Sequence, residues 1–260
     1  MDLGIKGKSA IVCASSKGLG KGCAVALAQA GCLLVLNGRD AAALTATARE
    51  IAAAHGVDVR TVAGDVGDEA VRAALLKACP APDILINNNG GPPPKAFEAL
   101  TRQDILNGVE ANMLTPILLA QAVLPGMAAR GFGRIVNVTS SSVRAPIAGL
   151  DVSSGARAGL TAFLAAAARA HASRNVTINA IQPGLFDTDR LKPGLKAAAA
   201  ARHGGDEAKA RAERWAAIPA GRFGTAAEFG ALCAFLCSAQ AGFITGQSVL
   251  IDGGAFPGAF

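Results

Sequence analysis

Short apolar segments alternate with longer amphipathic ones along most of this 260-residue chain. Short apolar runs are typical of strands buried on both faces, whereas apolar positions spaced three and four residues apart predict helices. The expected strands are residues 10–13, 33–37, 57–62, 84–87, 134–139, 176–181 and 248–251. The expected helices are residues 20–30, 41–55, 68–78, 101–130, 153–173 and 225–238, while the polar stretch 191–218 predicts one or two more.

Regular alternation of strands and helices favours right-handed crossovers and a parallel sheet covered on both faces. The predicted fold class is therefore α/β, a doubly wound Rossmann-type sheet in three layers. No low-complexity linker divides the chain, so residues 1–260 are expected to form one domain. Ligands bind such sheets outside the carboxyl ends of the strands, where the loops converge. The least patterned segment, residues 185–218, is interpreted as a variable flap over the substrate.

Composition narrows the class of protein. The chain is 51% hydrophobic and 17% charged, which excludes a disordered chain. Its net charge of +6 comes from scattered Lys and Arg, which disfavours a nucleic-acid partner. Six cysteines lie mostly in apolar runs without metal-ligand spacing, so we expect reduced thiols, no metal site and a cytoplasmic protein. We find no signal peptide and no uninterrupted apolar run of transmembrane length, so no membrane partner is expected.

The segment SAIVCASSKGLGKG at residues 9–22 predicts a strand, a glycine turn and the start of a helix. Glycine lets the backbone approach a ligand closely, and a helix N-terminus offers free N–H groups to an anion. The turn is therefore a candidate phosphate-binding site, and its residues are Ser15, Ser16, Lys17, Gly18, Leu19 and Gly20. Ala14 holds the first small-residue position, so the G-x-G-x-x-G fingerprint is absent and an ordinary structural turn remains an alternative.

Several further motifs occur in a fixed order. Cys13-Ala14-x3-Gly18-x-Gly20 lies where short-chain dehydrogenases/reductases carry T-G-x3-G-x-G, and Asn87-Asn88-Asn89-Gly90 lies where they carry N-N-A-G. The other matches are Asp65-Val66, Asn112, Ser140, Pro183-Gly184 with Thr188, and Asp252-Gly253-Gly254. In this order and spacing, the chain resembles that family nearly from end to end.

The resemblance implies a nicotinamide dinucleotide as cofactor. Besides the glycine turn, it assigns to cofactor binding Asn37, Arg39, Asp65, Val66, Asn88, Asn89, Gly90, Arg157, Pro183, Gly184 and Thr188. Gly38 appears where NAD-preferring relatives carry an acid, and Lys17 and Arg39 are both basic. We therefore expect NADP(H) rather than NAD(H).

The resemblance breaks at the reaction centre. The family carries Y-x-x-x-K thirteen residues after the catalytic serine, but here Ser153 stands for the Tyr and Arg157 for the Lys, and the chain has no tyrosine. A serine hydroxyl is a much weaker acid than a phenol, and a guanidinium does not release its proton. The candidate catalytic residues are Ser140 for the substrate oxygen, Ser153 for the proton, Arg157 for the ribose or an oxyanion, and Asn112 for a proton relay.

Three functions stay open. The first is an NADP(H)-dependent oxidoreductase of a small carbonyl or alcohol, similar to a 3-oxoacyl reductase. The second is a non-redox lyase, hydrolase-like cleavage enzyme or isomerase of a β-dicarbonyl compound, and the third is a catalytically silent nucleotide binder. The resemblance also implies a homo-oligomer, a dimer or tetramer formed through the helices at 101–130 and 153–173.

Overall fold

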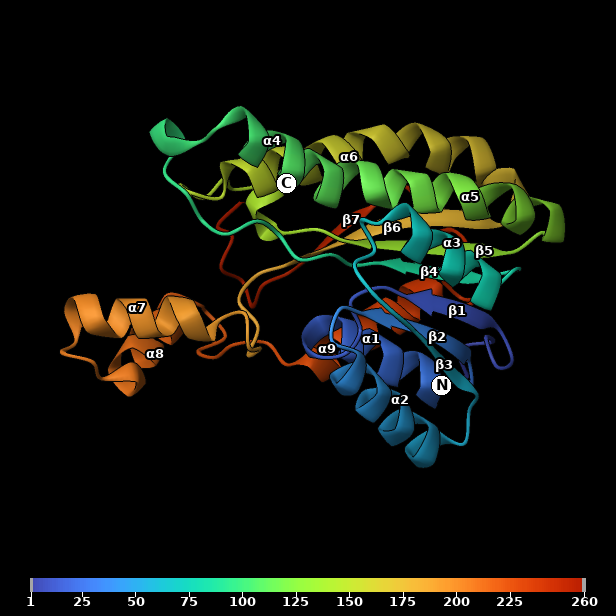
Figure 1. Ribbon diagram of the computed structural model, residues 1–260, viewed down its shortest axis with the longest axis horizontal. Coiled ribbons are helices and arrows are strands. Elements are labelled where there is room, and N and C mark those ends of the chain that lie inside the picture. Colours follow the sequence, from blue (N-terminus) through green and yellow to red (C-terminus); the bar gives the residue numbers. More distant parts are fainter. Residues whose placement is uncertain (1, 259–260) are drawn as a thin grey trace.

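The computed structural model describes residues 2–258, and within them a seven-stranded parallel sheet forms the centre of the molecule (Figure 1). The strand order is β3-β2-β1-β4-β5-β6-β7, so that strands are added outward in one direction from β1 to β3 and in the other direction from β4 to β7. The fold class predicted from the sequence is therefore confirmed. The strands are β1 (Ser9–Val12), β2 (Leu33–Gly38), β3 (Val59–Ala63), β4 (Ile84–Asn87), β5 (Gly133–Val138), β6 (Val176–Pro183) and β7 (Ser248–Ile251).

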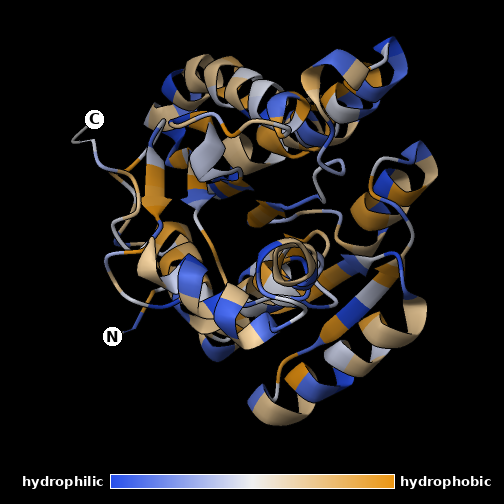
Figure 2. Ribbon diagram, turned by 90° about the vertical axis from the view of Figure 1, so that its left-hand side faces the viewer, coloured by the Kyte–Doolittle hydropathy of each residue, from blue (hydrophilic) through white to orange (hydrophobic). Residues whose placement is uncertain are grey.

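Helices cover both faces of the sheet. One layer holds α1 (Gly18–Gln29), α2 (Ala41–His55) and α9 (Ala226–Cys237), and the other holds α3 (Glu69–Ala78), α5 (Thr115–Arg130) and α6 (Asp151–His171). Successive strand residues point to opposite layers: Ala10 and Val12 belong to the first core, and Ile11 belongs to the second. Figure 2 accordingly shows strong hydrophobic colouring on the central strands.

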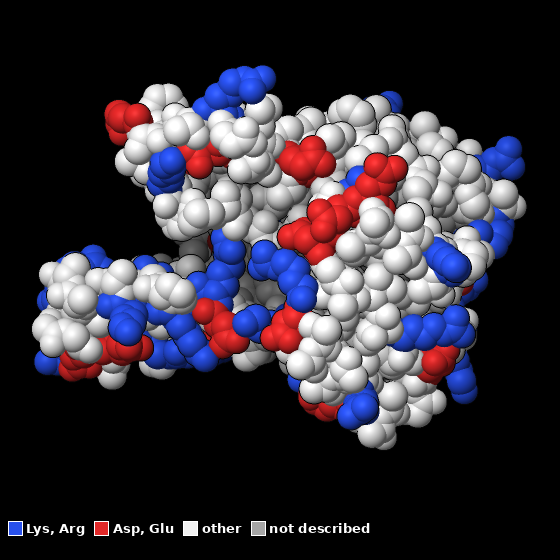
Figure 3. Space-filling model, viewed as in Figure 1, with Lys and Arg blue, Asp and Glu red and all other residues white. Residues whose placement is uncertain are grey.

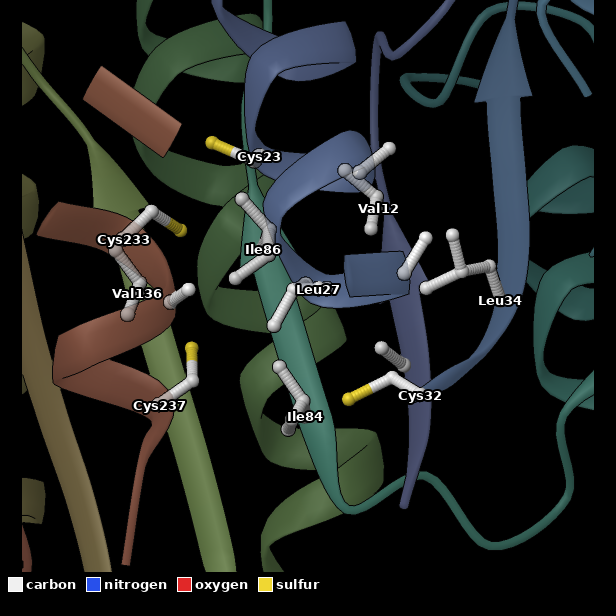
Figure 4. Close-up of a cluster of buried hydrophobic side chains, with 14 of the residues drawn as sticks. Val12, Cys23, Leu27, Cys32, Leu34, Ile84, Ile86, Val136, Cys233 and Cys237 are labelled. Carbon is white, nitrogen blue, oxygen red and sulfur yellow. The ribbon is translucent and has the colours of Figure 1, made fainter. Parts of the chain in front are cut away.

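The first core contains most of the thiols (Figure 4). All six cysteines are free and buried, which agrees with the expected reduced thiols. Burial raises the pKa of Cys13 and of Cys32 to about 12, so both stay protonated at neutral pH. Helices α1 and α9 touch through their backbones, because a Cβ built on Gly230 would lie 2.2 Å from the carbonyl oxygen of Gly22.

The expected helix at 101–130 is continuous but changes its hydrogen bonding. Thr101 caps α4 (Arg102–Val109) through a capping box with Asp104, as Thr225 and Glu228 cap α9. A π turn at Glu110–Leu114 separates α4 from α5. The interruption thus precedes both prolines of this stretch, Pro116 and Pro125. Pro116 carries no N–H to donate to the carbonyl of residue 112, and the regular pattern breaks there.

The same run, Arg102–Arg130, is long and apolar enough by length and composition to cross a membrane, with a mean hydropathy of 1.3. It is not an uninterrupted apolar run, since Glu110, Asn112 and Gln121 lie within it. Half of its apolar window is buried within the fold, where α5 packs on the second core. This is the packing of a core helix, and core helices pass the same test.

Helices α7 (Lys192–Arg202) and α8 (Glu207–Ala216) project from the carboxyl edge of the sheet, away from the main body (Figure 1). They have a small core of their own, in which Leu191, Leu195, Ile218 and Phe223 are buried. The Trp215 ring packs edge-on against Phe223 with 5.8 Å between ring centroids. Trp215 therefore stabilises this lobe.

Candidate functional site

The glycine turn between β1 and α1 is held in place by buried hydrogen bonds. Ser15 is fully buried; its backbone N–H donates to the Asn37 carbonyl at 2.7 Å and its hydroxyl to the Val12 carbonyl at 2.9 Å. Ala14 has φ +46°, the left-handed region, where the family carries glycine. A Cβ built on Gly20 would lie 2.2 Å from the Ala14 carbonyl oxygen. Ser15 therefore shapes the turn, and Gly20 permits its close approach to β1.

The start of α1 can accept an anion. Lys17 is the N-cap and makes no side-chain cap hydrogen bond, so the first-turn N–H groups have no such partner. Gly18 has φ +60°, and Thr188 faces it, with a methyl carbon 3.6 Å from the point where a Cβ would lie. The exposed Lys17 ammonium lies 3.4 Å from Asp189. The structure thus brings Lys17, Gly18 and Thr188 together, and Leu19 follows in the first turn of α1.

The residues expected at the adenosine end lie after β2 and β3. The Asn37 amide donates to the carbonyls of Val62, at 3.0 Å, and Gly64, at 3.1 Å, so it positions these loops. The exposed Arg39 guanidinium lies 3.9 Å from the Asp65 carboxylate, which also accepts from the Gly67 N–H at 2.9 Å.

Two more of the predicted cofactor-binding residues, Val66 and Ser16, have structural contacts near the adenosine end. Val66 is buried in the second core. Ser16 accepts a hydrogen bond at its carbonyl from Thr47 at 2.8 Å, which ties the turn to α2.

The loop after β4 carries the asparagine motif. Asn88 donates to the Ala14 carbonyl at 3.3 Å, and Asn89 donates to the Ala111 carbonyl at 3.0 Å. Asn112, within the π turn, donates to the Gly90 carbonyl at 3.1 Å. Its buried Oδ1 has no hydrogen-bond partner among the described residues. Asn112 therefore positions this loop and retains one acceptor.

The carboxyl ends of β5 and β6 supply the next predicted residues. The Ser140 hydroxyl oxygen accepts from the Ser142 N–H at 3.1 Å and from the Ser142 hydroxyl at 2.9 Å, so its own proton remains available. A Cβ built on Gly184 would lie 2.6 Å from the Asp252 Cβ, so the turn after Pro183 is packed against the last motif of the chain.

Ser153 and Arg157 lie one turn apart near the start of α6, and both are buried. The Arg157 guanidinium donates through Nη1 to the Ser153 hydroxyl oxygen and through Nη2 to the Asn89 carbonyl at 3.0 Å. Burial, and then the positive charge of Arg190, lower the pKa of Arg157 to about 10, so Arg157 remains charged at neutral pH. Arg157 forms no ion pair within residues 2–258, and a buried charge without such a partner is costly to the fold.

Sequence reasoning missed Arg190 and Gly91. A Cβ built on Gly91 would lie 3.0 Å from Nη2 of Arg190 and 3.1 Å from both Nη1 of Arg157 and Oγ of Ser153. Arg190 also donates to the Gly91 carbonyl at 3.3 Å. The only signal in the sequence is a basic residue shortly after Thr188, and nothing in its spacing connects it with residue 157. Among the described residues, no group of three or more His, Cys, Asp or Glu could hold a metal ion.

These features fit a dinucleotide. The first-turn N–H groups of α1 suit a phosphate group at a helix N-terminus, and the topology brings the loops after β1, β4, β5 and β6 to one edge of the sheet. Around the hollow between the α7–α8 lobe and the main body, Lys and Arg side chains gather together with acidic ones (Figure 3).

The family model described as "Enoyl-(Acyl carrier protein) reductase" matches residues 13–255. The chain belongs to the short-chain dehydrogenase/reductase family. A 3-oxoacyl-[acyl-carrier-protein] reductase FabG of Aquifex aeolicus is 31% identical, over 98% of this chain and all of the relative. The NADPH-dependent reductase BacG of Bacillus subtilis is 30% identical, over 95% of this chain and 97% of the relative.

Solved structures of short-chain dehydrogenases/reductases also match over nearly the whole chain. An L-sorbose reductase from Gluconobacter frateurii, complexed with NADPH and L-sorbose, superposes with a TM-score of 0.93 at 29% identity, covering 99% of this chain and 100% of the other. YwfH, an NADPH-dependent reductase involved in bacilysin biosynthesis, superposes with a TM-score of 0.91 at 29% identity, covering 97% of this chain and 100% of the other.

Proposed function

We propose that this chain is an NADP(H)-dependent oxidoreductase of a small carbonyl or alcohol, similar to 3-oxoacyl reductases, in which Ser153 and Arg157 replace the family's Tyr and Lys. The observation that supports it most is the anion-accepting turn at the start of α1, in a chain whose relatives are named as NADPH-dependent reductases. When bound, the nicotinamide would supply the hydride.

The residues proposed to hold the cofactor follow the edge of the sheet. The first-turn N–H groups of α1, with Lys17 and Thr188, would bind the phosphates. Arg39 would bind the 2′-phosphate, since its side chain is 81% exposed and its guanidinium lies 3.9 Å from the partly exposed Asp65 carboxylate. The other proposed contacts are the remaining residues that the family resemblance assigns to the cofactor.

The Ser153–Arg157 pair is proposed to stabilise negative charge on the substrate oxygen. Because the Arg157 guanidinium donates to the Ser153 oxygen, the Ser153 proton is free to point toward a carbonyl oxygen. The adjacent positive charge also makes that hydroxyl a stronger donor. Ser140 is proposed to bind the same oxygen, and the free acceptor of Asn112 to hold a water that delivers the proton.

Nucleotide binding and turnover test this function separately. Calorimetry should show NADPH binding, and NADPH absorbance should fall when ketones and 3-oxoacyl thioesters are added. Tight NADPH binding with no absorbance loss on any substrate would refute the redox function, and no binding of either nucleotide would refute the assignment of the cleft.

Arg49, in the helix that follows Arg39, provides a matched control for the proposed role of Arg39. Arg39→Ala should weaken NADPH binding about 10- to 100-fold through loss of a charged contact, and should leave NADH binding unchanged. Arg49→Ala, an exposed residue of α2, removes the same charge and should change neither. Equal losses for both nucleotides in Arg39→Ala would contradict the role in 2′-phosphate binding.

A second candidate is a non-redox lyase, hydrolase-like enzyme or isomerase of a β-dicarbonyl compound. The observation in its favour is the lack of any tyrosine in the chain, together with a buried guanidinium that can stabilise an enolate without hydride transfer. Substrate turnover by protein stripped of nucleotide would support it. Strict dependence of turnover on NADPH oxidation would exclude it.

We also propose that residues 185–218 cover the substrate, and that the protein is a cytoplasmic homo-oligomer, a dimer or tetramer. Large apolar side chains are exposed on the layer of α4, α5 and α6, namely Ile105, Leu106, Val109, Leu114 and Phe163. Light scattering should give a dimer or tetramer mass, and Phe163→Glu should lower it. A monomer in the unsubstituted protein would overturn the proposed assembly.

A further inference from the structure

Two guanidinium groups from distant parts of the chain point at the same glycine. Arg157 lies on α6 and Arg190 on the segment between β6 and α7, and both flank Gly91 in the loop after β4. We propose that Arg157 and Arg190 form a binding site for a carboxylate of the substrate beside Ser153, which stays free for the reacting carbonyl oxygen, so that the substrate is an oxo acid with its carboxylate close to its carbonyl. This inference rests on the proposed oxidoreductase function and names its substrate class.

The geometry leaves donors for an anion. A guanidinium carries five N–H groups; Arg157 uses two in hydrogen bonds to Ser153 and Asn89, and Arg190 uses one, to the Gly91 carbonyl. Their nearest nitrogens both lie within 3.1 Å of one point beside Gly91, so they are at most roughly 6 Å apart. Because Oγ of Ser153 lies equally near that point, a ligand that contacts all three groups must carry its carboxylate close to its carbonyl.

The charges around the site also favour an anion. Within residues 2–258, neither Arg157 nor Arg190 forms an ion pair, whereas the neighbouring Lys17 and Lys192 both pair with Asp189. The two guanidinium groups therefore repel each other without a compensating acid, and a bound carboxylate would relieve that repulsion. Guanidinium groups bind carboxylates through paired hydrogen bonds, which suits a planar oxo acid.

The phosphates of the cofactor could also supply an anion, but the structure offers them a separate site at the start of α1. The phosphate-accepting turn is at Lys17, Gly18 and Thr188, whereas Arg190 donates to the loop that faces Ser153. Ser153 is the residue proposed to act on the substrate oxygen. A carboxylate beside Ser153 therefore belongs to the molecule that carries the reacting carbonyl.

The test compares acetoacetate with acetoacetamide, its neutral isostere, by calorimetry on the protein with and without NADP⁺. We expect acetoacetate to bind at least about 10-fold more tightly than acetoacetamide. Arg190→Gln should weaken acetoacetate binding about 10- to 100-fold and leave acetoacetamide and NADPH binding unchanged. Lys192→Gln removes an equal charge from the same segment and should change none of the three.

The outcomes separate the two proposals. Equal affinities for acetoacetate and acetoacetamide, or equal losses in Arg190→Gln and Lys192→Gln, would overturn the carboxylate site while NADPH binding still supports the reductase. Loss of NADPH binding in Arg190→Gln with acetoacetate spared would also overturn it and assign Arg190 to the cofactor. A wild-type protein that prefers acetoacetate but binds no nucleotide would refute the reductase alone. Arg190→Lys, which keeps the charge, should restore part of the acetoacetate affinity if the variant proteins fold alike by circular dichroism.

Discussion

Replacing Arg157 by Met tests whether this arginine is present for function at a cost in stability. Its pKa of about 10, lowered from the usual value of a guanidinium, means that the folded protein disfavours the charged form by about 3 kcal/mol at neutral pH. Because the pKa is lowered, this free-energy penalty is fully present below pH 10 and decreases as the pH rises above 10. Methionine fills a similar volume without a charge.

We therefore expect Arg157→Met to have the same free energy of unfolding as the wild type or one higher by up to about 3 kcal/mol. At about 2 °C per kcal/mol for a chain of this size, the melting temperature would rise by up to about 6 °C. Reductase activity should fall at least about 100-fold, because one donor to the developing oxyanion is lost.

Arg134→Met is the matched control, since it removes the same side chain from another buried position. Arg134 donates to the carbonyl oxygens of Ser238, at 3.0 Å, Gly133, at 2.9 Å, and Asn175, at 2.8 Å, and stacks on Phe132. Its loss leaves buried acceptors unpaired and should cost about 3 kcal/mol or more. Thermal unfolding followed by circular dichroism measures both variants. If Arg157→Met were destabilised as strongly as Arg134→Met, Arg157 would be a structural residue and the reasoning would be refuted.

Two further predictions concern the scaffold. Ala14→Gly should raise the free energy of unfolding by about 0.5–1 kcal/mol in urea titrations, because glycine relieves the left-handed strain at φ +46° but loses more entropy on folding; a clear loss of stability would contradict that strain. Glu228→Gln should lower the melting temperature at pH 7, because Arg222 and the Thr225 cap lower the pKa of Glu228 to about 2. A carboxylate whose pKa is lowered in the folded protein stabilises the fold at every pH above the pKa it has in the unfolded chain. The difference in melting temperature between wild type and Glu228→Gln should therefore shrink as the pH falls from 4.5 toward 2. A difference that stays constant over this range would contradict the prediction.

The fold could be predicted from the sequence because the apolar periodicity, the helix caps and the order of strands and helices all indicated the same architecture. Strand β4 was predicted at its observed bounds, since three apolar residues lead directly into the asparagine motif that begins at Asn87. Helix α9 was recognisable from its capping box at Thr225 and Glu228. The π turn at Glu110–Leu114 could not be predicted, because Pro116 indicates a missing helical hydrogen bond but does not specify that the turn before it adopts π geometry.

The candidate site was only partly predictable. Ser153 and Arg157 could be paired from their i, i+4 spacing on one helix, and the structure joins them by a hydrogen bond. Arg190 is 33 residues further along in a segment without a clear pattern, so its approach to Gly91 depends on how that segment crosses the sheet edge. Ser15 was assigned to the cofactor from its place in the turn, but its hydroxyl bonds the Val12 carbonyl, a detail set by backbone direction.

The central claim is hydride transfer from NADPH at a site that has Ser153 and Arg157 but no phenol. NADPH deuterated at C4 of the nicotinamide tests it most directly, with acetoacetate and acetoacetamide as substrates and mass spectrometry of the product. The account predicts a hydroxy product that carries one deuterium, formed by the wild type and at least about 100-fold more slowly by Arg157→Met. A product without deuterium, or equal product in the absence of nucleotide, would contradict it.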